Sequence, residues 1–291
     1  MISFTYLEPA DIDEALAALA RYGDEAKVIA GGTGLVNLMK QRLVQPAYLI
    51  GLRRLAELGG LHYEGALHIG ALCSHRKIET SSLVQTHAPL LAETFRHVAS
   101  VRIRAMATIG GALAHADPNQ DPPPTLMVLD ARVRLRSRQR AREVSVGEFF
   151  SGYYETVMAP DEIITEVIIP PPPAGSGAAF VKFLPQTQDD YATVAVAARV
   201  TLDGDLVADA RVALGAAAAT PLRAAVVEDA LRGQAPTPTV LREAAALVAE
   251  AVDPAEDFRG SAAYKRDMAV VFVRRALAQA AARAQAGRGA A

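Results

Sequence analysis

Two glycine-rich segments carry the residues with the most specific chemical potential. Residues 28–35 have the sequence VIAGGTGL, and residues 108–112 have the sequence TIGGA. Glycine has no Cβ, so the backbone of such a segment can approach a phosphate, and successive N–H groups can point at one oxygen. Thr33 adds a hydroxyl donor. Hydrogen bonds to charged groups contribute about 1.5–3 kcal/mol each, so two such turns facing one pyrophosphate would hold a dinucleotide firmly.

The first glycine segment (residues 28–35) by itself is equally typical of an ordinary tight turn. It differs from the G-x-G-x-x-G fingerprint of Rossmann domains, and no acidic residue ends a strand about 20 residues later. The second glycine segment (residues 108–112) favours ligand binding, because it too follows an apolar and helical stretch and leads into HADP. Asp121, nine residues past Ala112, could accept a hydrogen bond from a ribose hydroxyl.

Other catalytic chemistry is poorly supported by the residue pattern. The six histidines show no H-x-x-x-H or E-x-x-H spacing, so we expect no metal site and interpret His115 as a loop-positioning residue. Asp189 and Asp190 are adjacent, and adjacent side chains in a strand point to opposite faces. Neither a G-x-S-x-G motif nor a Cys/His pair suggests a covalent nucleophile. We therefore expect no catalytic residue on this chain.

The elements expected around the first glycine segment are a helix, a strand and a second helix. The apolar spacing predicts an amphipathic helix over residues 11–23, a buried strand at residues 28–30 and a helix over residues 35–43. Residues 47–72 contain short β-like runs, and residues 67–70 form the clearest hairpin return.

The remaining pattern predicts a helical segment, a hairpin and a smaller C-terminal unit. Residues 81–100 are helical in pattern, and the three prolines 122–124 are expected to end an exposed loop and begin a helix or strand. Residues 133–146 alternate apolar and basic side chains like a surface hairpin, whose arginines we expect to be solvated rather than to bind phosphate. Prolines 170–173 followed by AGSG form the expected linker. Beyond it we expect two strands (residues 192–202 and 211–221) around a turn at residues 203–205, and three helices (residues 221–232, 239–252 and 262–283).

Composition narrows the functional classes. The 291 residues include 30 basic and 32 acidic side chains, so the chain lacks the basic field that nucleic-acid binding requires. We find no uncharged apolar run of about 18 residues and no signal-peptide pattern, and we expect a cytoplasmic protein without a transmembrane segment. Cys73 is the single cysteine and cannot by itself hold an iron–sulfur cluster.

Five sequence blocks, in order along nearly the whole chain, resemble the FAD-binding medium subunit of molybdenum hydroxylases, the family of carbon monoxide dehydrogenase and xanthine dehydrogenase. The blocks are residues 30–46, 103–123, 161–170, 188–200 and 258–277. The resemblance implies an α+β, PCMH-like fold with two FAD-binding subdomains, residues 1–60 and 61–172. A small α+β C-terminal domain of antiparallel sheet plus helices follows at residues 178–285.

The resemblance also implies a set of FAD-binding residues. The backbones of both glycine segments would hold the pyrophosphate, Asp121 would meet the ribose, Ile164 and Tyr191 would flank the isoalloxazine ring, and Lys182 would lie near the flavin. Each has a structural alternative: a core position for Ile164, a buried strand aromatic for Tyr191 and a solvated edge charge for Lys182. The expected cofactor-binding residues are Val28, Ile29, Ala30, Gly31, Gly32, Thr33, Gly34, Leu35, Thr108, Ile109, Gly110, Gly111, Ala112, Asp121, Ile164, Lys182 and Tyr191.

The resemblance further implies function and partners. The chain would take electrons from a small [2Fe-2S] subunit and pass them to an external acceptor, while a large molybdopterin-binding subunit oxidises the substrate. The assembly would be a heterotrimer or a dimer of heterotrimers. Two departures matter: Ala112 replaces a usual asparagine, and no basic residue lies near Gln186, which weakens the case for NAD as acceptor.

Two other functions remain open from the sequence. One is a stand-alone FAD-dependent oxidoreductase that acts on a small molecule beside the flavin. The other is a flavin-free assembly subunit, in which Ala112 has weakened the site.

Overall fold

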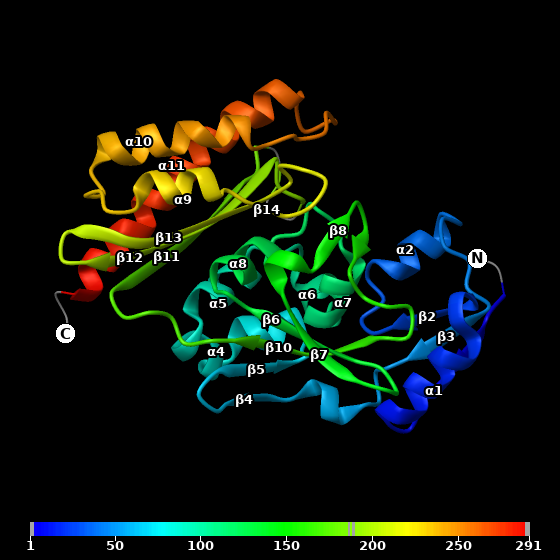
Figure 1. Cartoon of the computed structure of the whole chain (residues 1–291). Helices are drawn as coiled ribbons and strands as arrows, with labels where there is room; N and C mark the ends of the chain where they lie inside the picture. The colour runs from blue at the N-terminus through cyan, green and yellow to red at the C-terminus, as the bar shows by residue number, and fades with distance from the viewer. Residues whose placement is uncertain (1–2, 186, 188–189, 289–291) are drawn as a thin grey trace.

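The computed structural model describes residues 3–185, 187 and 190–288. The chain forms three regions, each built on its own β-sheet, arranged in sequence order from the N-terminal region through a central region to a helix-covered C-terminal region (Figure 1). None of the helices in the described part of the chain combines the length and apolar character that crossing a bilayer requires.

The N-terminal region is a small parallel sheet with one packed helix. Its strands have the order β1-β3-β2, and helix α1 buries Ile12, Ala15, Leu16 and Leu19 as the periodicity predicted. Asp11 caps α1 by accepting from the Glu14 amide at 2.8 Å. The helix ends at Tyr22, and Gly23, with a φ of 50°, is its C-cap. The expected second helix is shorter than predicted, and β1 was not anticipated. The elements are β1 (Thr5–Leu7), α1 (Ile12–Tyr22), η1 (Gly23–Glu25), β2 (Ala26–Ile29), α2 (Leu35–Lys40) and β3 (Tyr48–Gly51).

The central region is a five-stranded antiparallel sheet of order β4-β5-β10-β6-β7, covered by short helices. Its first part contains η2 (Ala56–Gly59), β4 (Leu61–Tyr63), β5 (Leu67–Gly70), α3 (His75–Thr80), α4 (Ser82–His87), α5 (Pro89–Arg96), α6 (Val101–Met106) and α7 (Ile109–His115). Its second part contains α8 (Pro122–Val128), β6 (Arg132–Arg136), β7 (Ala141–Ser145), η3 (Val146–Glu148), β8 (Phe150–Gly152), β9 (Glu155–Thr156) and β10 (Ile163–Ile169).

The predicted surface hairpin is confirmed as β6 and β7, and its arginines pair with carboxylates. Arg142 donates to Glu162 at 2.7 Å, and Arg134 donates to Glu166 at 2.6 Å. The arginines that we expected to be solvated are therefore ion-paired.

Two local expectations in this region were wrong. Residues 108–111 do not form a turn, because Thr108 caps helix α7 and the two glycines lie inside that helix. The loop before the three prolines is not exposed: Ala116, Asp117 and Pro118 are buried beneath neighbouring elements. Pro122 then begins α8, a position where the missing proline N–H is harmless.

The C-terminal region is a four-stranded antiparallel sheet of order β11-β12-β13-β14 with helices on one face (Figure 1). The predicted turn at residues 203–205 and the flanking strands are confirmed, although residues 216–221 leave the sheet and β11 was not anticipated. The elements are β11 (Ser176–Phe183), β12 (Val194–Asp203), β13 (Leu206–Gly215), β14 (Leu222–Arg223), α9 (Ala225–Leu231), α10 (Pro238–Ala246), η4 (Leu247–Glu250) and α11 (Ala262–Arg288).

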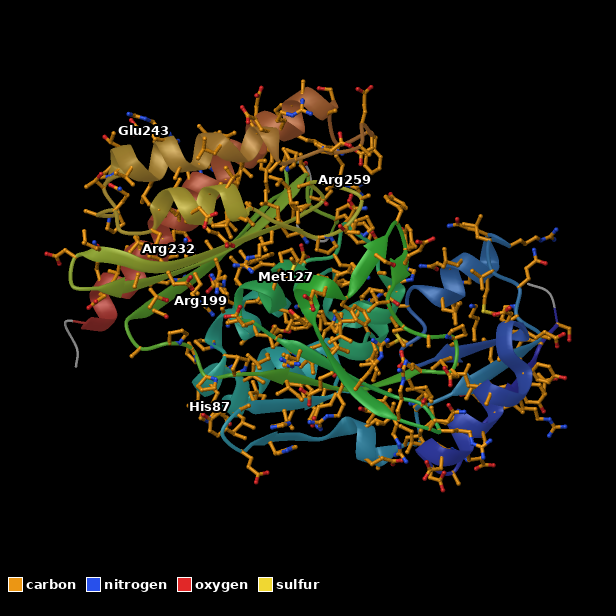
Figure 2. The ribbon with its side chains drawn as sticks, viewed as in Figure 1. His87, Met127, Arg199, Arg232, Glu243 and Arg259 are labelled. Atoms are coloured by element: carbon orange, nitrogen blue, oxygen red, sulfur yellow. The ribbon has the colours of Figure 1, made fainter. Side chains whose placement is uncertain are left out.

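The C-terminal sheet is covered on both faces, which joins it to the central region. Every residue of β12 from Val194 to Leu202 is buried. Helix α11 packs against β11 and β12, while α8 of the central region packs against β12 and β13. Arg199 extends from this sheet toward the central region (Figure 2). Its Nη1 lies 2.8 Å from Oδ2 of Asp130. The predicted α+β fold, with a C-terminal antiparallel sheet and helices, is confirmed.

Candidate functional site

The first glycine segment leaves no room for a side chain at two of its three glycines. A Cβ on Gly31 would overlap the carbonyl oxygen of Met106, and a Cβ on Gly34 would lie 2.8 Å from the His115 ring. Gly32 has a φ of 71°, which L-residues other than glycine rarely adopt. Gly31 and Gly34 are therefore required by the close approach of α6 and α7, and Gly32 by its backbone conformation. The contact with α6 and α7 was not visible in the sequence.

The amides of residues 31–35 in the first glycine segment are open, in the sense that their N–H groups are not used by hydrogen bonds within the described part of the chain. Val36 donates to the Gly32 carbonyl at 3.1 Å and Leu38 donates to the Gly34 carbonyl at 3.2 Å, so the carbonyl groups turn into the following helix. Among the residues that the structure describes, the N–H groups of residues 31–35 donate to no protein acceptor. Unpaired backbone donors on a glycine loop are suited to an anion.

The amides of the second glycine segment are already engaged. Ile109 donates to Cys73 O at 3.1 Å, Gly110 donates to Ala71 O at 2.9 Å, and Gly111 donates to Thr108 Oγ1 at 3.1 Å. The Ala112 amide donates to Thr108 O at 2.9 Å. The expectation that two open turns offer their amides to one pyrophosphate is thus corrected for this segment. A flavin contact through its other atoms stays a prediction.

The two glycine segments lie against each other. Gly31 faces the backbone of Met106 and Ala107, directly before Thr108, and Gly34 faces His115 at the end of α7. A Cβ on Gly111 would lie 3.8 Å from the Ala30 Cβ. The structure therefore places both predicted segments at one boundary, where β2 and α7 meet.

Asp121 and Lys182, predicted as two separate flavin contacts, form a buried ion pair with each other. Lys182 Nζ lies 2.7 Å from Asp121 Oδ2 and donates to the His97 carbonyl at 3.0 Å. Their side chains are only 3% and 5% exposed, so the solvated-charge alternative for Lys182 is wrong. Burial raises the pKa of Asp121 to about 6, although Lys182 opposes the shift. Asp121 Oδ1 is buried without a hydrogen-bond partner among the described residues.

Tyr191 lies at the edge of the C-terminal region and is 42% exposed, so it is not the buried strand aromatic of the alternative. Arg259, labelled in Figure 2, stacks over its ring at 5.7 Å and donates to Asp190 at 2.8 Å. Arg259 holds the pKa of Asp190 below its usual value, which leaves that carboxylate charged and paired. Asp189 and Gln186 lie outside the described residues.

Asp117 and Tyr154 belong to this boundary and were missed by sequence reasoning. Asp117 is buried and accepts from the Asn119 amide at 2.9 Å. The pKa of Tyr154 is raised to about 12, first by burial and then by the Asp117 charge and hydrogen bond; the same causes raise the pKa of Tyr191. The Tyr154 ring contacts His115, with centroids 5.3 Å apart. The HADP motif was the available signal in the sequence. Its His115 contacts the Tyr154 ring, and its Asp117 interacts with Tyr154 and Tyr191.

The remaining predicted residues occupy structural positions. Ile164 is 4% exposed on β10, opposite Leu135, and belongs to the core of the central region. Val28 and Ile29 lie on β2, and Leu35 begins α2. A role for these side chains beside a flavin stays a prediction.

The boundary as a whole fits a dinucleotide. Open amides on a glycine loop suit a pyrophosphate, and the unpartnered Asp121 oxygen suits a hydroxyl donor. Exposed Tyr191 supplies an aromatic surface for a planar ring. These features are those of a dinucleotide-binding protein.

Comparison with known proteins specifies the family. The model of the FAD binding domain in molybdopterin dehydrogenase matches residues 2–172, and that of the CO dehydrogenase flavoprotein C-terminal domain matches residues 179–280. The carbon monoxide dehydrogenase medium chain of Afipia carboxidovorans is 37% identical over 284 residues, covering 97% of this chain and 98% of the relative. The glyceraldehyde dehydrogenase medium chain of Sulfolobus acidocaldarius is 30% identical, and the match covers 96% of this chain and 98% of the relative.

A solved structure agrees with these sequence relatives. Carbon monoxide dehydrogenase from Hydrogenophaga pseudoflava superposes with a TM-score of 0.94 at 38% identity, covering 97% of this chain and 99% of the matched chain. The chain therefore belongs to the family of FAD-binding medium subunits of molybdenum hydroxylases. It is an oxidoreductase subunit, and FAD is its cofactor.

Proposed function

We propose that the chain is the electron-transfer subunit of a molybdenum hydroxylase complex, taking electrons from a [2Fe-2S] subunit and passing them to an external acceptor. The observation that carries this proposal is the first glycine segment, whose amides at residues 31–35 are open, beside two carboxylates of the described residues that are both ion-paired. Asp190 is bound to Arg259 and Asp121 is bound to Lys182, so neither is available to act on a substrate. FAD, when bound, supplies reversible electron-acceptor chemistry.

The chain's own residues would bind and orient that cofactor. The amides of Gly31 to Leu35 would receive the pyrophosphate, while the buried Asp121 oxygen would accept a ribose hydroxyl. Tyr191, held by Arg259 and by Asp117, would position the ring and shield it from water. The Asp121–Lys182 pair would keep the central and C-terminal regions together around the cofactor.

The partners would be a large molybdopterin subunit and a small [2Fe-2S] subunit, in a heterotrimer or a dimer of heterotrimers. Relatives of nearly full length carry names as different as carbon monoxide dehydrogenase and glyceraldehyde dehydrogenase. This variety supports substrate choice on another chain. A cytoplasmic location, and the division into residues 1–60, 61–172 and 178–285, are part of the same proposal.

The first test is the visible spectrum of the purified chain before and after addition of FAD. We expect flavin bands, intact FAD released on denaturation, and no oxidation of candidate hydroxylase substrates until the two partner subunits are added. Substrate oxidation by this chain alone, free of molybdenum and iron, would overturn the electron-transfer role. Rapid, substrate-specific bleaching of the isolated flavin would instead support a stand-alone oxidoreductase.

A further inference from the structure

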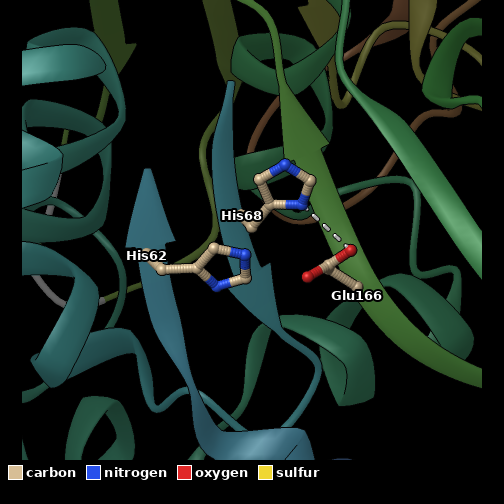
Figure 3. A group of neighbouring side chains, drawn as sticks. All are labelled: His62, His68 and Glu166. Atoms are coloured by element: carbon tan, nitrogen blue, oxygen red, sulfur yellow. Dashed lines mark ion pairs between the residues drawn. The ribbon is translucent and has the colours of Figure 1, made fainter. Parts of the chain in front are cut away.

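Two histidines and a glutamate gather on one face of the central sheet. His62 on β4 is paired directly with His68 on β5, and Glu166 on β10 is paired with Gly70, two residues further along β5 (Figure 3). Because side chains two residues apart in a strand share a face, the three project together. One ligand-type atom from each lies within 4.8 Å of the others.

Two of the three side chains are largely buried, and the third is exposed. The side chains of His68 and Glu166 are 17% and 14% exposed, whereas His62 is exposed. His68 Nδ1 is buried and lies 3.1 Å from Glu166 Oε2, yet it makes no hydrogen bond among the described residues. The nitrogen and the carboxylate oxygen thus face each other without a well-aligned hydrogen bond, and an ion between them would engage both.

We propose that His62, His68 and Glu166 bind Zn²⁺, with solvent in the fourth position. Imidazole nitrogens and carboxylate oxygens are the ligands that Zn²⁺ takes at about 2.0–2.2 Å, and three protein ligands plus water is a known arrangement. The two rings are stacked, with centroids 4.6 Å apart, so His62 must rotate to direct a nitrogen at the shared ion. Its exposure permits that rotation.

Arg134 competes with a metal ion for the Glu166 carboxylate. Its Nη1 lies 2.6 Å from Glu166 Oε2, the oxygen that also faces His68. Without a metal, these residues form a cross-strand ladder of charged and polar groups. The guanidinium repels a cation at this position, so Arg134 should weaken Zn²⁺ binding, whereas a ladder alone would not bind Zn²⁺ at all.

The test is calorimetric titration of the tag-free, full-length chain with ZnCl₂. We expect one Zn²⁺ per chain, and an affinity lower by about tenfold or more in His68→Ala and in Glu166→Gln, since even outer-shell losses weaken metal binding by about 10–100-fold. Arg134→Met should bind more tightly than the unmodified chain. His87→Ala is the matched control, because His87 stacks on Tyr63 of the same edge strand but lies outside the cluster, and it should leave the affinity unchanged.

A measurement on the unmodified chain avoids dependence on variant folding. X-ray absorption at the zinc edge should show two imidazoles and one carboxylate. Absence of Zn²⁺ binding, binding that survives both His68→Ala and Glu166→Gln, or a zinc spectrum with a different ligand set would overturn the proposal and leave the ladder as the role of these residues.

Discussion

The two glycine segments have similar sequences but different physical roles. In the first, Gly31 lies against the Met106 backbone, and the amides of residues 31–35 donate to no acceptor in the part of the chain that the structure describes. In the second, the amides are bound by Cys73, Ala71 and Thr108, and a Cβ on Gly110 would lie 2.6 Å from the Ala71 Cβ. The difference teaches that a glycine pair signals close approach, while the hydrogen-bond partners of its amides decide whether it can also receive an anion.

The largest expected effect is the loss of FAD affinity in Gly31→Ala, a substitution in the first glycine segment. The new Cβ overlaps the Met106 carbonyl, so the segment must shift and its amides lose their common direction. Loss of two hydrogen bonds to a charged group corresponds to about 3 kcal/mol or more, at least about 100-fold in FAD affinity. Fluorescence titration with FAD measures this. Gly59→Ala is the control, because a Cβ there meets nothing within 4 Å; unaltered FAD binding by Gly31→Ala would remove the distinction between the segments.

Gly110→Ala should lower the unfolding free energy while leaving the FAD affinity nearly unchanged. The added methyl group presses on Ala71, and overpacking of this kind costs about 1–3 kcal/mol of unfolding free energy. The amides of the second segment do not serve the ligand in our interpretation, so the FAD affinity of the folded fraction should change by less than about threefold. Urea unfolding and FAD titration of the same preparation give the two values. A large loss of affinity with little loss of stability would contradict the assigned role.

Asp121, which follows the second glycine segment, should make the unfolding free energy depend on pH by about 1 kcal/mol. Its folded pKa is raised to about 6 from 3.8, so its contribution to stability is fully present below pH 3.8 and is lost as the pH rises through about 6. Relative to Asp121→Asn, the unmodified chain should gain about 1 kcal/mol of unfolding free energy between pH 7 and pH 5. Urea unfolding of both proteins across this range measures the difference. Parallel curves would show that Asp121 does not titrate there.

The smallest expected effect is that of Ala112→Asn, which restores the side chain usual in the family. One neutral hydrogen bond contributes about 0.5–1.5 kcal/mol, so FAD should bind about two- to tenfold more tightly. Such a gain would show that the second segment acts through side chains rather than amides. Ala114→Asn, on the exposed face of the same helix, is the control. Equal FAD affinity in all three proteins would place the flavin away from residue 112.

Local pattern predicted much of the fold. The spacing of Ile12, Leu16 and Leu19 gave helix α1, and the alternation in residues 133–146 gave the β6–β7 hairpin, because both have a buried and a solvated face. Strand β11 was missed, and residues 108–111 were assigned to a turn. In that second case the cap formed by Thr108 and the packing on Ala71 stabilise a helix despite two glycines, and neither contact is visible in a local window.

Sequence by itself determined that this chain has two glycine segments, a family pattern in five blocks and too few cysteines for a cluster, since these depend only on residue identity and order. Tertiary structure decided which amides remain open, that Asp121 and Lys182 neutralise each other, and that His62, His68 and Glu166 meet. The physical reason is that hydrogen-bond saturation, desolvation and side-chain convergence all depend on neighbours that are distant along the chain. Strand pairing and sheet covering bring those neighbours together.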